Sequence, residues 1–186
     1  MNTLNRKKLL ASISFLRKNS GGFTLIELLV VIAIISVLSG VVLQSLTGAR
    51  KKTNDTARKT QLLEVNKAIT RYFTENGSYP STGGAWLSSE QGDIIPYNAD
   101  WVPNIVTAKL IPSLPKDPRG GASPDCTTGG WYRAYLYRSD GLHYKLLSRC
   151  SLEQDSYPAV NTQFYDPNRP TWALQLTDNY TATTVW

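Results

Sequence analysis

The sequence of 186 residues carries a formal charge of +6 and is long enough for one modest globular domain and a membrane-spanning helix. Residues 1–22 contain five of the twenty basic side chains and no acid, so the remainder of the chain, with 15 basic and 14 acidic side chains, is nearly neutral. That balance argues against a nucleic-acid-binding protein. The absence of a Walker motif and of a Gly-x-Gly-x-x-Gly motif argues against the nucleotide-dependent enzymes that use them.

An apolar run follows this basic segment from Phe23 to Leu46, and Glu27 is its only charged residue. Its 24 residues correspond to about 36 Å of α-helix, which is enough to span a bilayer. A secretory signal peptide has a shorter apolar region, of about 7 to 15 residues. The basic flank is expected to stay in the cytoplasm, which places the residues after about 50 outside it. Thr47-Gly48-Ala49 is a weak cleavage site that leaves a signal-anchored or secreted domain as an alternative.

The charge of Glu27 within the apolar run requires an explanation. A charged side chain in the bilayer costs roughly 2.5 to 3.5 kcal/mol on insertion scales and usually has a partner and a function. The residues around it are Gly22-Phe23-Thr24-Leu25-Ile26-Glu27-Leu28-Leu29-Val30-Val31-Ile32-Ala33-Ile34-Ile35. This run closely resembles the N-terminal signature of type IV pilins and of the pseudopilins of type II secretion and competence machines.

The resemblance implies how the chain is processed and assembled. A prepilin peptidase, which is an aspartic membrane protease, would cut between Gly22 and Phe23 and methylate the new amino group of Phe23. In the filament, the Glu27 carboxylate would meet the amino group of Phe23 from a neighbouring subunit, and the alternative is that Glu27 merely lies at the level of the lipid headgroups. The implied partners are the peptidase, other pilin-like subunits and, indirectly, an assembly ATPase and an inner-membrane platform protein.

The helical period continues beyond the apolar run, from Arg50 to Asn76. Apolar and neutral side chains recur there at spacings of three and four, with the charged ones mostly on another face: Ala57, Gln61, Leu62, Val65, Ile69, Tyr72 and Phe73 against Arg58, Lys59, Glu64, Lys67 and Arg71. No proline occurs before residue 80, and Asn76-Gly77 is a plausible stop. We therefore predict one helix from near Phe23 to near Glu75.

The remainder, rich in proline, glycine and tryptophan, is typical of short strands and turns. Ser78–Thr82 and Leu114–Pro118 resemble, more loosely, the loop that follows the long helix in major pseudopilins. Ile105–Ile111 is apolar and too short to be assigned to helix or strand.

Aromatic-rich runs from Trp131 to Arg138 and from Leu142 to Cys150 predict a β-hairpin with Asp140-Gly141 at its turn. A two-residue turn would pair Tyr137 with Tyr144 and Tyr135 with Leu146, on a face that packs on the long helix. A three-residue turn would reverse the faces. Alternation in Thr171–Thr177 predicts a further strand.

Cys126 and Cys150 both lie in the part expected outside the cytoplasm, where a disulfide is the natural interpretation. Two free buried thiols are the alternative. A metal site is not indicated, because the two cysteines and His143 lack zinc-site spacing.

Three other kinds of site have partial signals in the sequence. Loop acids are available to calcium, which the pseudopilin resemblance allows, but no Asp-x-Asp-x-Asp-Gly motif is present and solvated acids are the simpler interpretation: Asp93, Asp100, Asp117, Asp125, Asp155, Asp166 and Asp178.

Interleaved bases and aromatics on the hairpin are typical of single-stranded nucleic acid binding, against which an aromatic core with a charged outer face is the more economical interpretation: Trp131, Arg133, Tyr135, Tyr137, Arg138, Tyr144, Lys145 and Arg149. Ser113-x-x-Lys116 and the lone His143 indicate no enzyme.

The sequence thus predicts an α+β, pilin-like protein in which a long N-terminal helix packs against a small antiparallel sheet. Its expected parts are a cytoplasmic leader (1–22), a transmembrane and assembly half of the helix (23–46), an amphipathic half (47–76) and an extracytoplasmic β-rich domain (77–186). We expect a structural, non-catalytic filament subunit with no cofactor, anchored once in the cytoplasmic membrane and later part of a surface or periplasmic filament. A monomeric membrane-anchored binding domain is the alternative.

Overall fold

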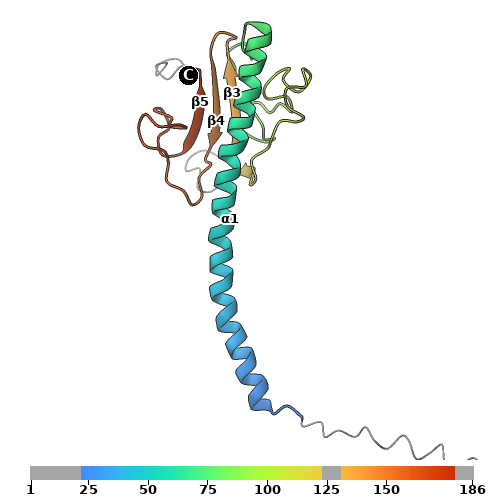
Figure 1. Cartoon of the computed structure of the whole chain (residues 1–186), viewed down its shortest axis with the longest axis vertical. Helices are drawn as coiled ribbons and strands as arrows, with labels where there is room; N and C mark the ends of the chain where they lie inside the picture. The colour runs from blue at the N-terminus through green and yellow to red at the C-terminus, as the bar shows by residue number, and fades with distance from the viewer. Residues whose placement is uncertain (1–21, 123–130, 179–186) are drawn as a thin grey trace, which may run out of the picture. The chain divides into compact units, whose positions relative to one another are not determined.

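The computed structural model describes residues 22–122 and 131–178 and confirms the α+β class (Figure 1). Its elements are helix α1 (Leu25–Asn76) and strands β1 (Leu87–Ser88), β2 (Gly121–Ala122), β3 (Tyr132–Ser139), β4 (Tyr144–Arg149) and β5 (Ala173–Thr177). The chain divides into two compact units, of which the first ends at Gln44 and the second begins at Ser45.

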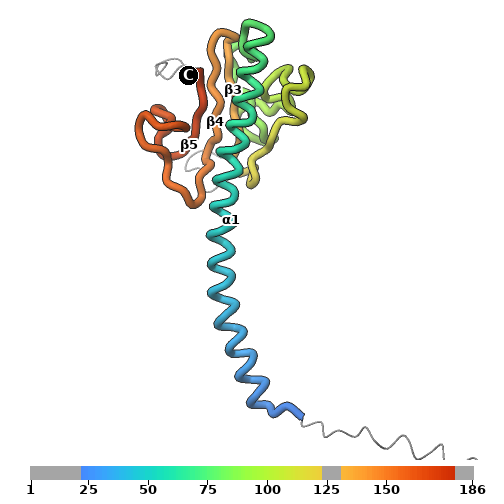
Figure 2. The backbone as a smooth tube through the Cα atoms, viewed as in Figure 1, coloured from blue at the N-terminus to red at the C-terminus, as the bar shows by residue number. Residues whose placement is uncertain are grey.

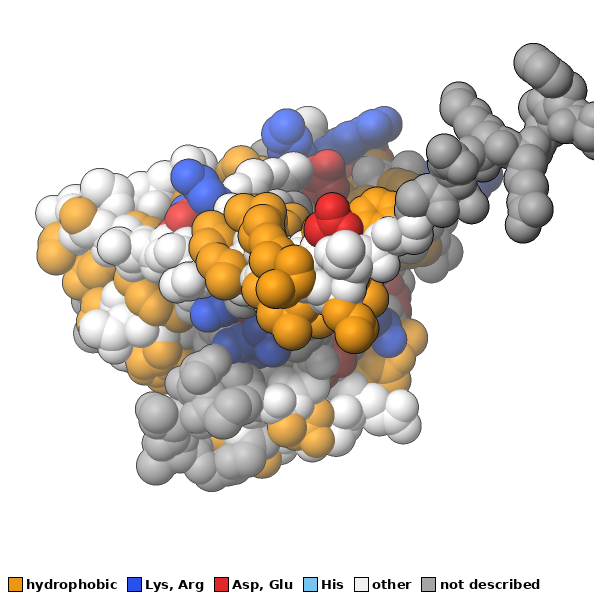
Figure 3. Space-filling model, turned by 90° about the horizontal axis from the view of Figure 1, so that it is seen from below, with side chains coloured by type: hydrophobic (Ala, Val, Ile, Leu, Met, Phe, Trp, Pro, Cys, Tyr) orange, Lys and Arg blue, Asp and Glu red, His pale blue; other side chains and the backbone are white. Residues whose placement is uncertain are grey.

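The described part of the first unit is the beginning of α1. Every side chain from Gly22 to Gln44 is exposed, including those of Leu25 and Ile26, which are 88% and 73% exposed. By length and composition α1 is able to cross a membrane. Figure 3 looks along this end of the helix and shows its hydrophobic side chains gathered around it. A helix that is apolar on all sides is stable only inside lipid or against other chains.

The second unit contains the rest of α1 and the sheet, and Figure 2 shows the backbone of α1 running along strands β3 and β4. The core between them is built from fully buried Leu62, Val65 and Ile69 on the helix and from Tyr135, Tyr137, Tyr144 and Leu146 on the strands, among others. Spacings of three and four keep these helix residues on one face, as predicted, but Phe73, predicted on that face, is 39% exposed and Arg58, predicted on the polar face, is buried.

Helix α1 ends where the sequence predicts. The Gly77 N–H donates to the carbonyl of Phe73 (2.8 Å), and Gly77 has a φ of 73°. This left-handed conformation carries a steric cost for residues with a Cβ, and it closes the helix with a single bond to the last turn.

The sheet is antiparallel with the order β1-β3-β4-β5, and β2 pairs with β3 as well. Both short strands pair with β3, opposite Leu136–Tyr137 and Tyr132–Arg133 respectively. The predicted strand near residues 171–177 is confirmed as β5, which pairs with β4.

The predicted register of the hairpin is wrong by two residues. Tyr137 pairs with Leu146, and Ser139 pairs with Tyr144, so the connection has four residues rather than two. Asp140 stabilises the wider turn, because its Oδ1 accepts the N–H groups of Leu142 and His143 (2.8 and 2.7 Å). A shift of two preserves the faces, so the aromatic side of the hairpin still packs on α1, as predicted.

The outer face of the sheet is also covered. Ala134, Leu136 and Leu147 form a second buried cluster, against which Trp86 and Ile95 pack. The basic side chains expected on a charged outer face are not in solvent. Lys145 and Arg149 lie on the same face as Leu147 and are 4% and 3% exposed, whereas Arg133 lies on the helix-facing side with Tyr135 and is 3% exposed.

Residues 105–111 form neither a helix nor a strand but a series of turns. Ala108 N–H donates to the carbonyl of Asn104 (2.8 Å), and Leu110 N–H donates to the carbonyl of Ile105 (3.0 Å). Positive φ values at Asn104 (67°) and Lys109 (57°) interrupt any helix. The run buries Ile105 completely, which explains its apolar composition.

Candidate functional site

The first candidate site lies at the start of α1, where Thr24 caps the helix. The N–H and the hydroxyl of Thr24 donate to Glu27 Oε2 (2.8 and 2.9 Å), and the Glu27 N–H donates back to Thr24 Oγ1 (3.3 Å). This reciprocal arrangement is a capping box, which satisfies backbone donors that have no partner within the helix. The pattern Thr-x-x-Glu is visible in the sequence, and the sequence analysis missed it.

The capping box leaves part of the Glu27 carboxylate free. Within the described residues only Oε2 accepts hydrogen bonds, and the whole side chain is exposed. The carboxylate is therefore held in one orientation at the positive end of the helix dipole while Oε1 remains available to another molecule.

Gly22 and Phe23 precede the helix, and no packing contact within the described residues requires a glycine or a phenylalanine at these positions. A Cβ on Gly22 would meet nothing within 4 Å, and the Phe23 side chain is 85% exposed. Nothing within the described part of this chain demands a glycine at residue 22.

A second site, which sequence reasoning missed, surrounds Arg58. The helical pattern placed Arg58 on the polar face, but its side chain is fully buried. Nε and Nη2 donate to the two oxygens of Asp117 (2.8 and 2.9 Å), Nη1 donates to Asp55 Oδ1 (3.0 Å), and Nη2 lies 2.9 Å from Glu153 Oε1. The prediction failed because a bidentate partner 59 residues away satisfies the guanidinium inside the protein.

The Arg58 network fastens two loops to α1. Asp55 accepts the backbone N–H groups of Glu153, Gln154 and Asp155, at 2.8 to 3.2 Å. Although burial raises the pKa of Glu153, hydrogen bonds from Arg119, Arg58 and Asn54 outweigh it and lower that pKa to about 2. Burial lowers the pKa of Arg58, but its bonds to Asp117 and Glu153 raise it overall.

Three of the seven loop acids that the sequence offered to calcium are not the solvated groups that it suggested. Asp117 pairs with Arg58, Asp166 pairs with Lys145 (3.2 Å), and Asp93 pairs with Arg149. Each of these three carboxylates is fully buried. Within residues 22–122 and 131–178 no three acidic, histidine or cysteine side chains are grouped to hold a metal, and Asp125 lies outside those ranges.

The same ion pairs remove the basis for nucleic-acid binding by the hairpin. Lys145 and Arg149 are engaged with Asp166 and Asp93, and Arg133 donates to the carbonyl of Cys150 (3.1 Å). A nucleic acid backbone needs exposed cations, and these three side chains are buried.

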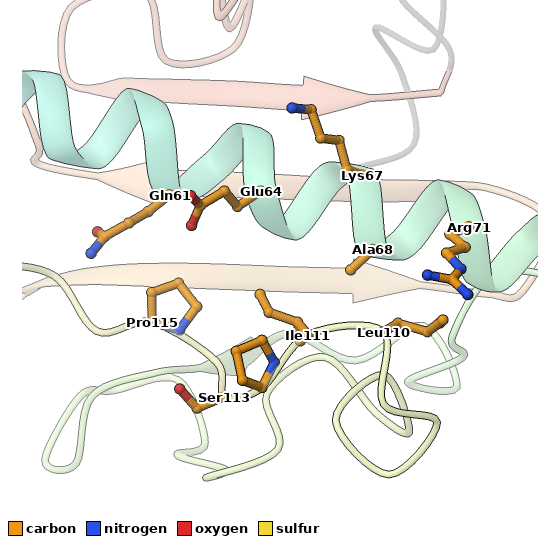
Figure 4. Close-up of a pocket in the computed structure, with 10 residues that line it drawn as sticks. Gln61, Glu64, Lys67, Ala68, Arg71, Leu110, Ile111, Ser113 and Pro115 are labelled. Atoms are coloured by element: carbon orange, nitrogen blue, oxygen red, sulfur yellow. The ribbon is translucent and has the colours of Figure 1, made fainter.

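The candidate enzyme residues do not form a catalytic arrangement. The Lys116 ammonium lies over the Tyr97 ring, 5.9 Å from its centroid, and the His143 ring is bonded to Asp178 (2.7 Å). Ser113 lines a groove of about 700 Å³ between α1 and residues 110–115. Figure 4 shows Glu64, Lys67 and Arg71 on the helix side of this groove and Leu110, Ile111 and Pro115 opposite.

Only one cysteine of the predicted disulfide between Cys126 and Cys150 lies within the described residues. Cys150 is buried directly after β4, with a φ of 55°. Cys126 lies outside the described residues, so the pairing stays a prediction.

Comparisons with known proteins point to the start of α1. The family model for the prokaryotic N-terminal methylation motif matches residues 17–43. The chain is 45% identical over 71 residues to the type IV wide pilus major component PilA4 of Thermus thermophilus, which is 38% of this chain and 54% of that protein. It therefore spans about half of the length of that relative.

Two further relatives are covered over most of their length. The type II secretion system core protein G of Escherichia coli is 32% identical over 129 residues, which are 68% of this chain and 79% of that protein. The protein of the same name from Klebsiella pneumoniae is 32% identical over 141 residues, 75% of this chain and 89% of that protein. No solved structure shows significant similarity.

Proposed function

The chain belongs to the family of type IV pilins and type II secretion pseudopilins, and from this we propose that it is a structural subunit of a pilus-like or pseudopilus filament. The observation that carries the proposal is the start of α1, where the matched motif opens a helix whose apolar side chains from Leu25 to Leu43 are all exposed. Such a surface needs lipid before assembly and neighbouring helices after it.

Maturation at Gly22-Phe23 is the first element of the proposal. A prepilin peptidase removes residues 1–22 and methylates the amino group of Phe23. Support comes from the open surroundings of Gly22, which leave the scissile bond accessible. Intact-mass analysis of the chain from cells with the peptidase tests this element: it should give a chain that begins at N-methyl-Phe23, and a bulky residue in place of Gly22 should block cleavage. A chain beginning at Arg50 contradicts it.

The proposed topology places the mature chain once through the cytoplasmic membrane with residues after about 50 outside. The basic leader supports this orientation. The filament then lies in the periplasm or at the cell surface. Assembly draws energy from a separate ATPase acting through a membrane platform protein, because this chain has no Walker motif.

Glu27 is the proposed assembly residue. Cleavage creates a positive amine four residues before it, and both charges are costly in lipid when they are unpaired. Pairing the Phe23 amine of one subunit with the Glu27 carboxylate of its neighbour compensates both charges and selects processed subunits. The capping box supports this role, since it orients the carboxylate and leaves Oε1 free.

Helix capping is the competing explanation for Glu27, and a substitution at Thr24 distinguishes capping from charge pairing between subunits. Glu27→Leu and Glu27→Gln remove the charge, whereas Thr24→Ala removes the capping hydroxyl and retains the carboxylate. All three chains should insert and be cleaved. In cells without the wild-type copy, only the two Glu27 variants should lose most of the filament yield. Equal losses for Thr24→Ala and Glu27→Gln would assign Glu27 to capping alone, and a processed wild-type chain that never enters filaments would indicate a monomeric anchored domain.

A further inference from the structure

A basic groove begins where the apolar part of α1 ends. It has a volume of about 540 Å³ and lies entirely within the second unit. Its lining combines Leu46 and Ala49 with Arg50 and Lys51 from the helix and with Arg119 from the loop before β2. The groove is therefore apolar at Leu46 and cationic one helical turn further on, at Arg50.

The helix cations beside this groove have no acidic partner among the described residues, whereas Arg119 pairs with Glu153. Within the described residues, Arg50, Lys51 and Lys52 form no ion pair. Asp55, on the next turn of the helix, is fully buried and is occupied by Arg58 and by backbone N–H groups. Glu153 also lines the groove, but Arg58 and Arg119 both bind it.

The position of these cations along the helix matches the depth of lipid headgroups. Arg50 and Lys52 lie four and six residues beyond Leu46, which corresponds to about 6 to 9 Å of helix. The headgroup layer on each side of a bilayer is of similar thickness, roughly 5 to 8 Å. Three consecutive basic residues on the outer side also run against the usual bias of basic residues toward the cytoplasm, and they offer positive charge to an anion at that level.

We propose that this groove binds the phosphate of an anionic phospholipid of the outer leaflet. Arg50 and Lys51 bind the phosphodiester, beside Arg119, which keeps its ion pair with Glu153. Leu46 and Ala49 contact the glycerol and the first methylenes of the acyl chains. A free phosphate would make no use of the apolar end, so the amphipathic lining selects a lipid. Binding holds the subunit upright at the membrane surface before it is polymerised. The inference rests on the membrane topology of the proposed function.

The test uses the full processed chain in nanodiscs that contain phosphatidylcholine and a minor fraction of phosphatidylglycerol. Native mass spectrometry measures which lipids remain bound to the chain. The wild-type chain should retain phosphatidylglycerol well above its share of the disc. The triple variant Arg50→Gln/Lys51→Gln/Lys52→Gln should lose this enrichment by about tenfold or more, since each cation near an anionic surface contributes to attraction.

A second triple variant is the matched control. Lys67→Gln/Lys109→Gln/Lys116→Gln removes the same charge from three exposed lysines elsewhere in the second unit and should keep the enrichment. Retained enrichment in the groove variant, or an equal loss in the control, would overturn the proposed site. Displacement of the lipid by inorganic phosphate would overturn a lipid as the ligand.

Membrane insertion is measured separately, by resistance to alkaline extraction. An extractable wild-type chain would overturn the topology of the proposed function, and with it this inference. An inserted chain without phosphatidylglycerol enrichment overturns the headgroup site alone.

Discussion

Arg58 and Asp117 form a two-bond ion pair in which neither side chain is exposed, with Nε and Nη2 of the guanidinium 2.8 and 2.9 Å from the carboxylate oxygens. The pair joins the start of the helix's packed half to the loop before β2, and Asp55 and Glu153 complete the coordination of the guanidinium. A buried pair of this kind is a poor source of net stability, but removing one partner leaves the others charged in the interior.

The substitution Arg58→Ala should therefore lower the free energy of unfolding of the domain by about 3 to 5 kcal/mol. Arg58→Lys should also be strongly destabilising, because one ammonium cannot reproduce the two parallel bonds to Asp117. Thermal and urea unfolding in detergent, followed by the near-ultraviolet signal of the buried tyrosines and Trp101, measures both. Lys59→Ala, which removes a half-exposed pair with Asp155 on the adjacent helix position, should cost no more than about 1 kcal/mol. Equal costs at both positions would contradict the assignment.

Lowering the pH should destabilise the domain through protonation of Glu153. Its pKa is lowered from 4.5 to about 2, so the folded state binds fewer protons than the unfolded state between these values. The resulting stability is present in full above pH 4.5 and is lost as the pH falls toward 2. The contribution is on the order of 3 kcal/mol. Glu153→Gln should flatten the pH dependence of the urea midpoint in this window, and an unchanged dependence would show that other carboxylates cause it.

His143 should titrate above its ordinary range. Its pKa is raised from 6.5 mainly by the hydrogen bond with Asp178, which also accepts the N–H of Tyr144 (3.0 Å). The stabilisation from the pair is therefore present below pH 6.5 and is lost as the pH rises through the folded-state pKa. Because this is the only histidine in the chain, a proton NMR titration of its ring is unambiguous. Asp178→Asn should return the pKa toward the ordinary value, and no difference between the two titrations would refute the pairing.

Cys126 and Cys150 should be linked in protein isolated under oxidising conditions. Closing a loop of about 25 residues constrains the unfolded chain by roughly 3 kcal/mol in the entropic description. Peptide mapping without reductant should recover the linked pair, and reduction should lower the unfolding temperature. Complete reaction of both thiols with a maleimide in the native state would exclude the bond.

Features that depend on neighbours along the chain can be predicted from the sequence. The apolar run, the helix from Leu25 to Asn76, its end at Gly77 and the existence of the hairpin follow from periodicity, charge spacing and turn residues. The motif at Gly22-Phe23 and Glu27 is likewise local, which is why it indicated the family from a small part of the chain. The capping partner Thr24 was visible in the same stretch.

The location of the charges and the register of the hairpin depend on contacts between distant parts of the chain. Arg58, Lys145 and Arg149 have the sequence context of exposed bases, yet each is buried because a carboxylate distant in the chain meets it inside the protein. The strand register depended on a side chain in the turn and on cross-strand packing rather than on the shortest loop. Such pairings depend on which loops cover which face of the sheet. Local periodicity carries no information about them, because partners such as Arg58 and Asp117, or Arg149 and Asp93, lie 50 or more residues apart in the chain.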